Sequence, residues 1–425
     1  QHKFNNFLKL GTHMQYSYTE SNMADLEGAA ALNGIWRDGW PTLPVYREDG
    51  SFAVPKDNPA ISTLFGDGAY WNPVANYREV TNKSSVSRLL GDVYAEFQLA
   101  KGLTFKTNFG LDIANKRDYN YTTSKITTST GYGKGGNGYT KMMSRITENI
   151  LSYANTWGDH RFTATGVYSW QNYMYEDLSI SGNGFINDET GAWDMGQASR
   201  ETVDYGSDKY ENSLISWTGR LTYAYKDRYL LTATARYDGS SKFPSHSRWG
   251  FFPSASVGWR MSEETFIKDK LPFVNNLKLR GSYGKMGDDS VADYQFISGY
   301  DYPNTSGDKF NKTPKGYFFN GSFMNSLGFR AVANPNITWY TVKTLNVGID
   351  ADLWNGLLGV SFDLFQRDRD NLMANRIATI PGTFGAAMPK ENLESDRTKG
   401  FEVELRHRNR VGQVNYSVSG NIAIT

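Results

Sequence analysis

The fold is decided by residues 215–237, which read ISWTGRLTYAYKDRYLLTATARY. Apolar side chains stand at every second position on both sides of a short polar segment, residues 226–228, and Thr, Ser and Arg fill most of the alternate positions. Side chains of a β-strand point to opposite faces in turn, so this pattern predicts a hairpin with one apolar and one polar face. Residues 253–260 repeat the alternation after a loop.

The composition favours an all-β protein with many turns, because 15% of the 425 residues are aromatic and 42 are glycine. The chain has no cysteine, which excludes a disulfide framework and any cysteine-based zinc or redox site. Its net charge of +1 gives no electrostatic basis for binding nucleic acid. The sequence has no apolar run long enough for a transmembrane helix, but a membrane β-barrel needs apolar residues only at alternate positions.

The two-faced pattern recurs in about thirteen segments, many of them near the ~9–11 residues that a tilted strand needs to cross a bilayer. Their connections alternate in length. The short ones are residues 101–102, 158–159, 226–228, 354–356 and 409–413, and the long ones are 20–86, 115–144, 176–211, 285–340 and 370–399. Residues 238–250 form a loop of middle length on the long-loop side, and 261–276 form an unusually long inner turn. Short periplasmic turns and long extracellular loops are typical of an outer-membrane barrel, so we predict an all-β fold, an antiparallel transmembrane barrel domain over residues 1–425.

Aromatic residues cluster near the expected strand ends: Trp157, Tyr223, Tyr225, Tyr229, Tyr237, Trp249, Trp259 and Trp354. Tyr and Trp prefer the headgroup layer of a membrane, which predicts two aromatic girdles. They could also line the rim of a soluble barrel or propeller. The loop asymmetry, and the alternation of Asp350 and Asp352 with aliphatic residues, favour the membrane barrel.

Two groups of residues are candidates for function. The first lies on the polar side of predicted strands and would face the lumen, in contact with a plug or with water: Arg220, Arg236, Asp350, Asp352, Glu402 and Glu404. The second is aromatic, lies in the long loops and would bind a ligand or a partner: Trp36, Trp40, Tyr70, Trp71, Trp193, Tyr300, Tyr302, Phe318 and Phe319. Exposed aromatic rings stack on sugars and anchor protein interfaces. The alternatives are ion-paired wall residues without a ligand role, and loops that pack on one another.

Other motifs give no catalytic or metal site. Residues 131–136 match G-x-G-x-x-G but lie among polar residues with a strand after them, so a flexible outer loop is the better interpretation. The five histidines lack metal-ligand spacing, and Asp288, Asp289 and Asp293 lack the calcium-loop spacing, which indicates solvated loop acids. We therefore expect neither an enzyme nor a cofactor.

Five strings of sequence resemble the SusC/RagA family of TonB-dependent outer-membrane transporters of the Bacteroidetes type. They are RYDGSSKF at 236–243, RWGFFPSASVGWR at 248–260, LKLRGSYG at 277–284, NPNITW at 334–339 and KGFEVEL at 399–405. The first string is specific, and the resemblance covers most of the chain from about Leu89 onward.

This resemblance implies a twenty-two-stranded barrel, filled by an N-terminal plug, in the outer membrane of a bacterium. The family imports oligosaccharides and in some members peptides. A SusD-like lipoprotein forms an external lid, and TonB with ExbB and ExbD supplies energy; two such complexes are commonly paired. We expect this chain to be an internal part of such a protein, surrounded by outer-membrane lipid, without the plug, the TonB-contacting segment and the last strands.

Four alternative functions remain open from the sequence. A TonB-dependent receptor for a siderophore or cobalamin would lack the lipoprotein partner, and a passive porin would conduct without TonB. A soluble glycan-binding β-protein would fractionate into the aqueous phase. An outer-membrane hydrolase has least support, because no catalytic set is visible.

Overall fold

A single antiparallel sheet makes up most of the computed structural model, which describes residues 2–22, 44–53, 72–126, 132–301, 316–325, 328–329, 332–376 and 388–425. Its fourteen strands follow the chain in the order β1 to β10 and then β15 to β18. The strands are β1 (His2–Lys3), β2 (Leu8–Asn22), β3 (Val80–Ala100), β4 (Leu103–Thr122), β5 (Gly133–Trp157), β6 (His160–Phe185), β7 (Asp204–Tyr225), β8 (Tyr229–Ser240), β9 (Trp249–Arg260), β10 (Val274–Asp288), β15 (Tyr340–Leu353), β16 (Leu358–Ala374), β17 (Glu391–Val411) and β18 (Val414–Ile424). The thirteen predicted segments correspond to β2–β10 and β15–β18, which confirms the predicted fold class.

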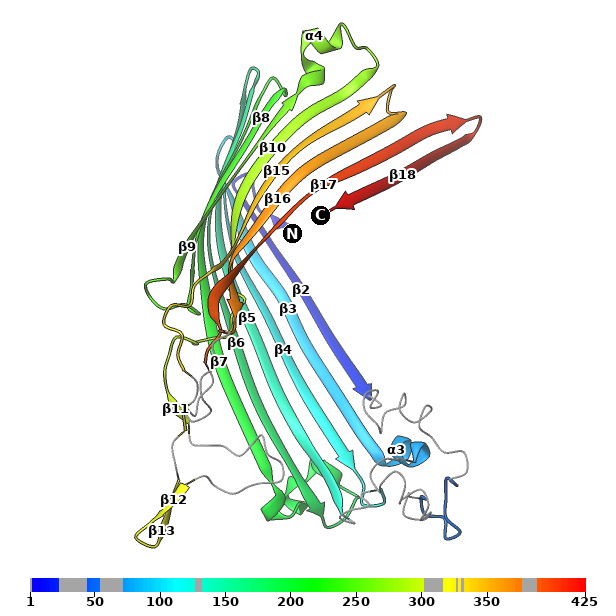
Figure 1. Ribbon diagram of the computed structural model, residues 1–425, viewed down its shortest axis with the longest axis vertical. Helices are drawn as coiled ribbons and strands as arrows, with labels where there is room; N and C mark the ends of the chain where they lie inside the picture. The colour runs from blue at the N-terminus through cyan, green and yellow to red at the C-terminus, as the bar shows by residue number, and fades with distance from the viewer. Residues whose placement is uncertain are drawn as a thin grey trace.

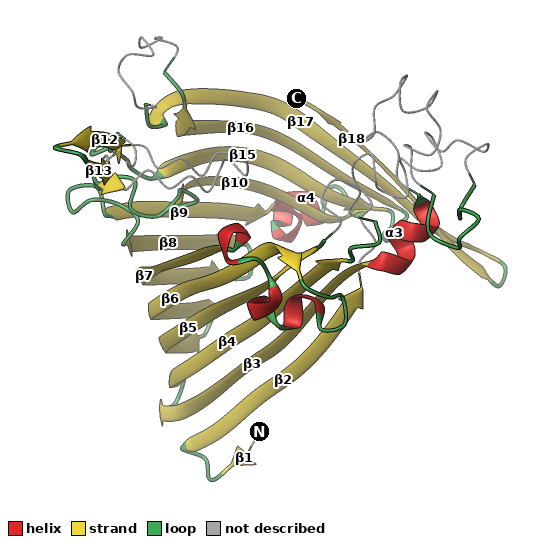
Figure 2. Cartoon of the chain, turned by 90° about the horizontal axis from the view of Figure 1, so that it is seen from below, coloured by secondary structure: helices red, strands yellow, loops and turns green. Residues whose placement is uncertain are grey.

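The sheet is an open, strongly curved wall. Its first long strands and its last strands tilt in opposite directions across the molecule (Figure 1). Seen along the long axis, the sheet curves continuously from β17 round to β2 (Figure 2). Within the described residues β1 and β18 are the two edges and do not pair with one another.

Tight turns join the strands at one end of the sheet, which we call the turn end. Lys226 and Asp227 both have positive φ, of 52° and 53°, in the three-residue connection between the paired Tyr225 and Tyr229, which matches the right-handed twist of the hairpin. Gly102 has a φ of +79°, and a Cβ added there would lie 2.2 Å from the carbonyl oxygen of Ala154. The sequence therefore determines these hairpins locally, through residues that adopt a left-handed backbone.

Apart from the β9–β10 connection, which holds η5 and α4 at the turn end, the longer connections join strand ends at the opposite end of the sheet, which we call the loop end. Two of them are shorter than expected. β5 begins at Gly133, β6 ends at Phe185 and β7 begins at Asp204, well inside the ranges predicted for loops. Strands of 20 to 26 residues in β4–β7 exceed the ~9–11 residues that cross a bilayer. In the outer parts of β4–β6 one face packs against the β6–β7 connection through Tyr119, Tyr121 and Phe185, so the alternation that marks a half-buried strand is lost there.

The glycine-rich residues 131–136 are an example of a predicted loop that lies partly in a strand. We expected a flexible loop, but residues 133–136 belong to β5: 134–136 pair with β4, and Gly133 pairs with Phe185 on β6. A Cβ on Gly135 would lie 2.5 Å from the carbonyl oxygen of Asn120 and 3.0 Å from the Cβ of Ala192. Glycine is needed here because the β6–β7 connection packs directly onto the strand.

The two faces of the sheet stay separate from strand to strand. Leu279, Ile349, Phe362 and Val403 stand opposite one another on β10, β15, β16 and β17, and this side is called the apolar face. One residue along, Lys278, Asp350, Ser361 and Glu404 form the matching row of the polar face. A shift of one residue in any strand would exchange the two sets, so the alternation specifies the register.

The connections contain short helices and small hairpins. They are α3 (Pro73–Glu79), η2 (Gly191–Trp193), η3 (Met195–Gln197), η4 (Arg200–Thr202), η5 (Met261–Glu263), α4 (Thr265–Lys268), β11 (Tyr300–Asp301), β12 (Gly316–Phe319), β13 (Ser322–Asn325) and β14 (Gly328–Phe329). β11 pairs with β14, and β12 pairs with β13. No helix in the described part of the chain is long and apolar enough to cross a membrane.

Candidate functional site

A cluster of charges on the polar face joins three strands. Arg280 on β10 donates to Asp350 on β15 at 3.0 Å and to Asp363 on β16 at 2.5 Å. Ser361 donates to Asp350 at 2.8 Å. The side chains are half-buried, with exposures of 30% for Arg280 and 14% for Asp363. We did not predict Arg280 as a lumen candidate, although its alternation with Leu277 and Leu279 could have indicated it.

The predicted lumen residues lie on this polar face but do not form one site. Asp352 pairs with Arg406 at 3.0 Å. Arg236 pairs at 2.6 Å with Asp238, which is buried, and also donates to Ser216 at 3.0 Å. In the described ranges Arg220, Glu402 and Glu404 make no ion pair, and their strand neighbours are Thr234, Asp363 and Ser361.

A buried cluster of three aromatic residues and one isoleucine, here called the hub, joins the loops on the polar side of the loop end. It consists of Phe243, Phe252, Ile337 and Trp339, whose exposures are 0 to 6%. The Trp339 ring lies 5.0 Å from the ring of Phe243 and 5.3 Å from that of Phe252. Three of the strings that carry the family resemblance therefore meet here, and their aromatic residues hold the fold together.

Hydrogen bonds tie the hub to its three loops. Ser247 donates to the carbonyl oxygen of Ile337 at 2.7 Å. Asn392 accepts from the backbone N–H of Thr338 at 3.0 Å and donates to the carbonyl oxygen of Asn371 at 2.7 Å. These bonds cross-link the β8–β9 and β10–β15 connections with the loop-end parts of β16 and β17.

The loop acids are more constrained than we expected. Asp289 accepts a hydrogen bond from Ser240 at 2.7 Å, and Lys242 donates to the Asp289 carbonyl oxygen at 3.1 Å. Asp293 accepts from Asn212 at 3.3 Å. Sequence spacing could not show this, because the partners are more than forty residues away and come from β7, β8 and the β8–β9 connection.

The loop aromatics are displayed on supported elements. Phe318 and Phe319 belong to the β12–β13 hairpin, which projects from the loop end (Figure 1), and they are 78% and 76% exposed. Trp193 is 65% exposed and stacks on Tyr119 with ring centroids 4.3 Å apart. Tyr300 lies in β11. The remaining candidates, Trp36, Trp40, Tyr70, Trp71 and Tyr302, lie outside the described residues.

The base under Trp193 is a second buried cluster, made by Tyr119, Tyr121, Phe185, Ala192 and Ala198. The carboxylate of Asp188 accepts from the Tyr121 hydroxyl at 2.8 Å and from the Ser124 hydroxyl at 2.6 Å. Burial alone would raise the pKa of Asp188, but the hydrogen bonds from Ser124 and Tyr121 outweigh it and hold that pKa below its usual value. The charged carboxylate of Asp188 therefore holds the β6–β7 connection to Tyr121 on β4 and to Ser124 just after it.

At the turn end, aromatic rings form a row on the apolar face. Tyr225, Tyr229 and Trp259 stand opposite one another on β7, β8 and β9. Glu264 in the long inner turn accepts from the Tyr229 hydroxyl at 2.7 Å and from the Trp259 indole at 3.1 Å, and also pairs with Arg228. The hydrogen bonds from Tyr229 and Trp259 keep the pKa of Glu264 below its usual value.

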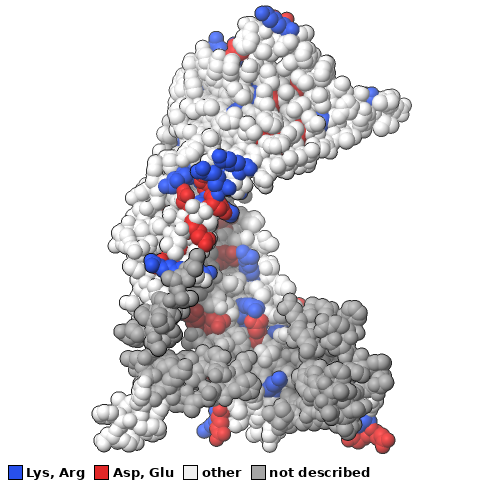
Figure 3. Space-filling model, in the orientation of Figure 1, with Lys and Arg blue, Asp and Glu red and all other residues white. Residues whose placement is uncertain are grey.

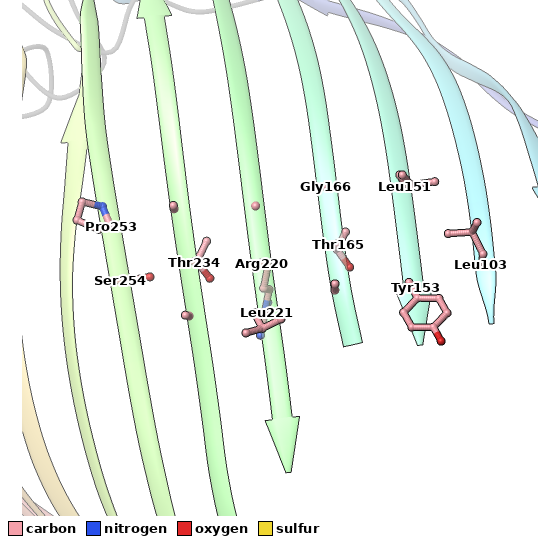
Figure 4. Close-up of a pocket in the computed structure, with 14 residues that line it drawn as sticks. Leu103, Leu151, Tyr153, Thr165, Gly166, Arg220, Leu221, Thr234, Pro253 and Ser254 are labelled. Carbon is pink, nitrogen blue, oxygen red and sulfur yellow. The ribbon is translucent and has the colours of Figure 1, made fainter. Parts of the chain in front are cut away.

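An apolar hollow of about 610 Å³ lies on the same face, well away from the loops. Leu103, Leu151 and Tyr153 line one side of it and Pro253 the other (Figure 4). The hollow exists because small residues, Gly166 and Gly219 among them, stand between these side chains. Its surface is almost entirely apolar, so it offers little to a polar ligand.

Comparison with known proteins gives related chains along nearly the whole sequence. The sequence model described as "TonB dependent receptor-like, beta-barrel" matches residues 30–425. The chain is 30% identical over 407 residues to TonB-dependent receptor P26 of Formosa agariphila, covering 95% of this chain and 38% of that protein. It is 26% identical to TonB-dependent receptor SusC of Bacteroides thetaiotaomicron, covering 95% of this chain and 40% of that protein.

A solved structure, that of the RagAB peptide transporter, has the same fold. The TM-score is 0.79 at 18% identity, over 99% of this chain and 44% of that chain. The chain thus spans about two fifths of the length of the relatives that it matches. These matches confirm the predicted family and its outer-membrane location: the chain belongs to the TonB-dependent receptor-like β-barrel family, and within it is similar to SusC.

Proposed function

We propose that this chain is part of the wall of a TonB-dependent importer in the bacterial outer membrane. The observation that carries the proposal is the register, which keeps one apolar and one polar face across β10, β15, β16 and β17. The apolar face would meet lipid and the polar face the lumen, as in other membrane barrels. The loop end, with its long connections, would then be extracellular.

The cargo that we propose is a nutrient too large for porins, an oligosaccharide or a peptide. The similarity to SusC and the shared fold with the RagAB peptide transporter support these two classes. On this proposal a SusD-like lipoprotein covers the loop end, TonB with ExbB and ExbD supplies energy, and two such complexes pair. The lumen residues Arg220, Glu402 and Glu404 would contact the plug or water.

The exposed loop aromatics are the proposed contacts with cargo or lid. Phe318 and Phe319 stand on a hairpin whose ten residues, 316–325, carry no charge. Trp193 offers one broad ring face, held in place by Tyr119. Aromatic side chains of this kind supply much contact area while losing little conformational entropy.

The test is uptake by cells that carry the full-length gene. Deletion should abolish import of at least one labelled oligosaccharide or peptide, and normal growth on every glycan and peptide tried would count against the proposal. A Phe318→Ser/Phe319→Ser variant and a Trp193→Ser variant should lower uptake or release a copurifying lipoprotein. Phe266→Ser is the matched control, because Phe266 is 49% exposed in α4 at the turn end.

A further inference from the structure

A β-bulge interrupts the ladder between β16 and β17 at the loop end. Arg369 pairs with Asp396, but the next pair is Leu372 with Glu394, so two residues of β16 stand opposite one residue of β17. One of the two, Asn371, has a φ of 63°, in the left-handed region that residues other than glycine rarely adopt. Bulges re-aim side chains, and such backbone outliers cluster at ligand sites, so the surroundings of this bulge are a candidate binding site.

Hydrogen bonds to the hub hold the bulge in place. The side-chain amide of Asn371 donates to the carbonyl oxygen of Trp339 at 3.2 Å, and Asn392 donates to the carbonyl oxygen of Asn371 at 2.7 Å. Thr341, two residues after Trp339, pairs with Asp370 of the bulge and is only 8% exposed. The bulge is therefore a preorganised part of the wall, which lowers the entropic cost of binding a ligand there.

A polar hollow of about 480 Å³ lies beside the bulge. Asp370 and Asn371 of the bulge line it, together with Lys285, Lys343 and Glu394. Figure 3 shows positive and negative side chains side by side at the waist of the molecule, where β17 runs in Figure 1. The two lysines and the two carboxylates of the hollow balance, so it suits a neutral or zwitterionic ligand better than an anion.

The charges of the hollow are neutralised in its middle and not at its two ends. Lys343 donates to Asp370 at 2.8 Å. In the part of the chain that the structure describes, Lys285 and Glu394 make no ion pair; the Lys285 ammonium lies 5.9 Å from the centroid of the Phe252 ring, and Glu394 is exposed. β10 and β17 are separated by β15 and β16, which places Lys285 and Glu394 about 14 Å apart across the sheet.

We propose that this hollow binds a short peptide with free termini, whose carboxylate pairs with Lys285 and whose ammonium pairs with Glu394. The inference rests on the proposed import function, because it selects the peptide from the two cargo classes. An extended chain spans ~3.3–3.6 Å per residue, so a peptide of about three or four residues bridges the two charges. Both contacts are charge-assisted hydrogen bonds, which are stronger than neutral ones.

The other groups of the hollow fit the middle of a peptide. Leu393 lines it and is 54% exposed, which offers apolar contact to a peptide side chain, and Ser395 can donate to or accept from a peptide bond. An uncharged oligosaccharide would leave Lys285 and Glu394 without partners. The placement of the two charges therefore favours a zwitterionic peptide over a neutral sugar.

The experiment measures binding of tetraalanine to the purified full-length protein by calorimetry. Tetraalanine with an acetylated N-terminus and an amidated C-terminus should bind about tenfold more weakly, because it carries neither charge. Lys285→Gln and Glu394→Gln should each weaken binding of the free peptide by a similar factor. Lys101→Gln, at the turn end, and Glu189→Gln, in the β6–β7 connection, are the matched controls and should bind like the parent.

A charge exchange tests the site without removing charge. Lys285→Glu alone places carboxylates at both ends and should abolish the preference for the free peptide. Lys285→Glu/Glu394→Lys presents the same two charges in exchanged positions, so it should again prefer the free peptide, bound in the opposite direction. Equal affinity of this double variant for free and blocked tetraalanine would overturn the proposal.

Two further arms separate this site from the proposed function. If maltotetraose competes with tetraalanine and loses affinity in the same variants, the hollow is a sugar site and the peptide proposal is wrong. Cells that carry the full-length gene should take up labelled tetraalanine, and Lys285→Gln/Glu394→Gln should slow that uptake. Uptake at the parent rate by this variant rejects only the hollow as a cargo site, whereas binding without any uptake by the parent rejects only the import function.

Discussion

The indole N–H of Trp339 donates to the carbonyl oxygen of Arg248 at 3.1 Å, although the two residues are ninety-one positions apart in the chain. This bond joins the connection before β15 to the start of β9. Both residues come from strings that carry the family resemblance. Their shared role is structural, because the bond fixes the loops that meet at the loop end relative to one another.

Shortening Trp339 should loosen the hub. Trp339→Phe keeps an aromatic ring but removes one of the two donors to the Arg248 carbonyl oxygen, which still accepts from the Ser240 N–H at 3.2 Å, and we expect a loss of about 0.5–1.5 kcal/mol. Trp339→Ala also opens a cavity among Phe243 and Phe252, with an expected loss of about 3–5 kcal/mol. Thermal unfolding of the full-length protein, followed by its shift in electrophoretic mobility, would measure both. A larger loss for the Phe variant than for the Ala variant would contradict the packing role.

Breaking the Arg280 cluster should cost more than breaking an exposed pair. Arg280→Gln leaves Asp350 and Asp363 half-buried without a cation, and we expect a loss of about 1–3 kcal/mol. The control is Arg161→Gln, whose partner Asp227 is 57% exposed, with an expected loss of about 0–1 kcal/mol. Asp363→Asn should recover part of the loss in the Arg280→Gln background, which a double-mutant cycle would show.

Charges placed on the two faces should have opposite consequences. Ile349→Lys puts an ammonium group into the proposed lipid belt and should cost about 2–4 kcal/mol. Glu404→Lys, on the polar face of β17, should be tolerated, because that side chain is exposed and would remain in water. The yield of folded protein in the outer membrane is the measurement. Equal yields for the two variants would remove the basis for the lipid assignment.

The hydrogen bonds that Glu264 accepts from Tyr229 and Trp259 should make the turn end sensitive to acid. The pKa of Glu264 is lower in the folded protein than the ordinary value of about 4.3. Its stabilising effect is therefore present above that value and is lost as the pH falls through the folded pKa. Acid titration followed by Trp259 fluorescence should show this loss, and Glu264→Gln should abolish it. Glu263→Gln, beside it in the same turn, should leave the titration unchanged.

The sequence was sufficient to predict the strands but not the residues at which the long ones end. Residues 215–237 predict both the hairpin and its two faces, and the structure places Lys226 and Asp227 in the turn. The outer parts of β5 and β6 were missed, because a loop packs on one of their faces and removes the alternation that marks a half-buried strand. For the same reason Gly133–Gly136 were assigned to a loop.

For the candidate sites, too, the sequence predicts the face on which a residue lies but not its partners. Arg220 and Glu404 could be assigned to the polar face from their position alone. That Arg280 bridges Asp350 and Asp363 depends on partners 70 and 83 residues away, which no local pattern reveals. The support under Trp193 likewise depends on Tyr119 from another strand.

By itself the sequence determined which face of each strand is apolar and where the tight turns fall, because both follow from neighbouring residues and from the stereochemistry of the backbone. The tertiary structure alone decided which charges neutralise one another and which residues form the hub. Those outcomes depend on register between strands that are distant in sequence, and that register is set only when the whole sheet assembles.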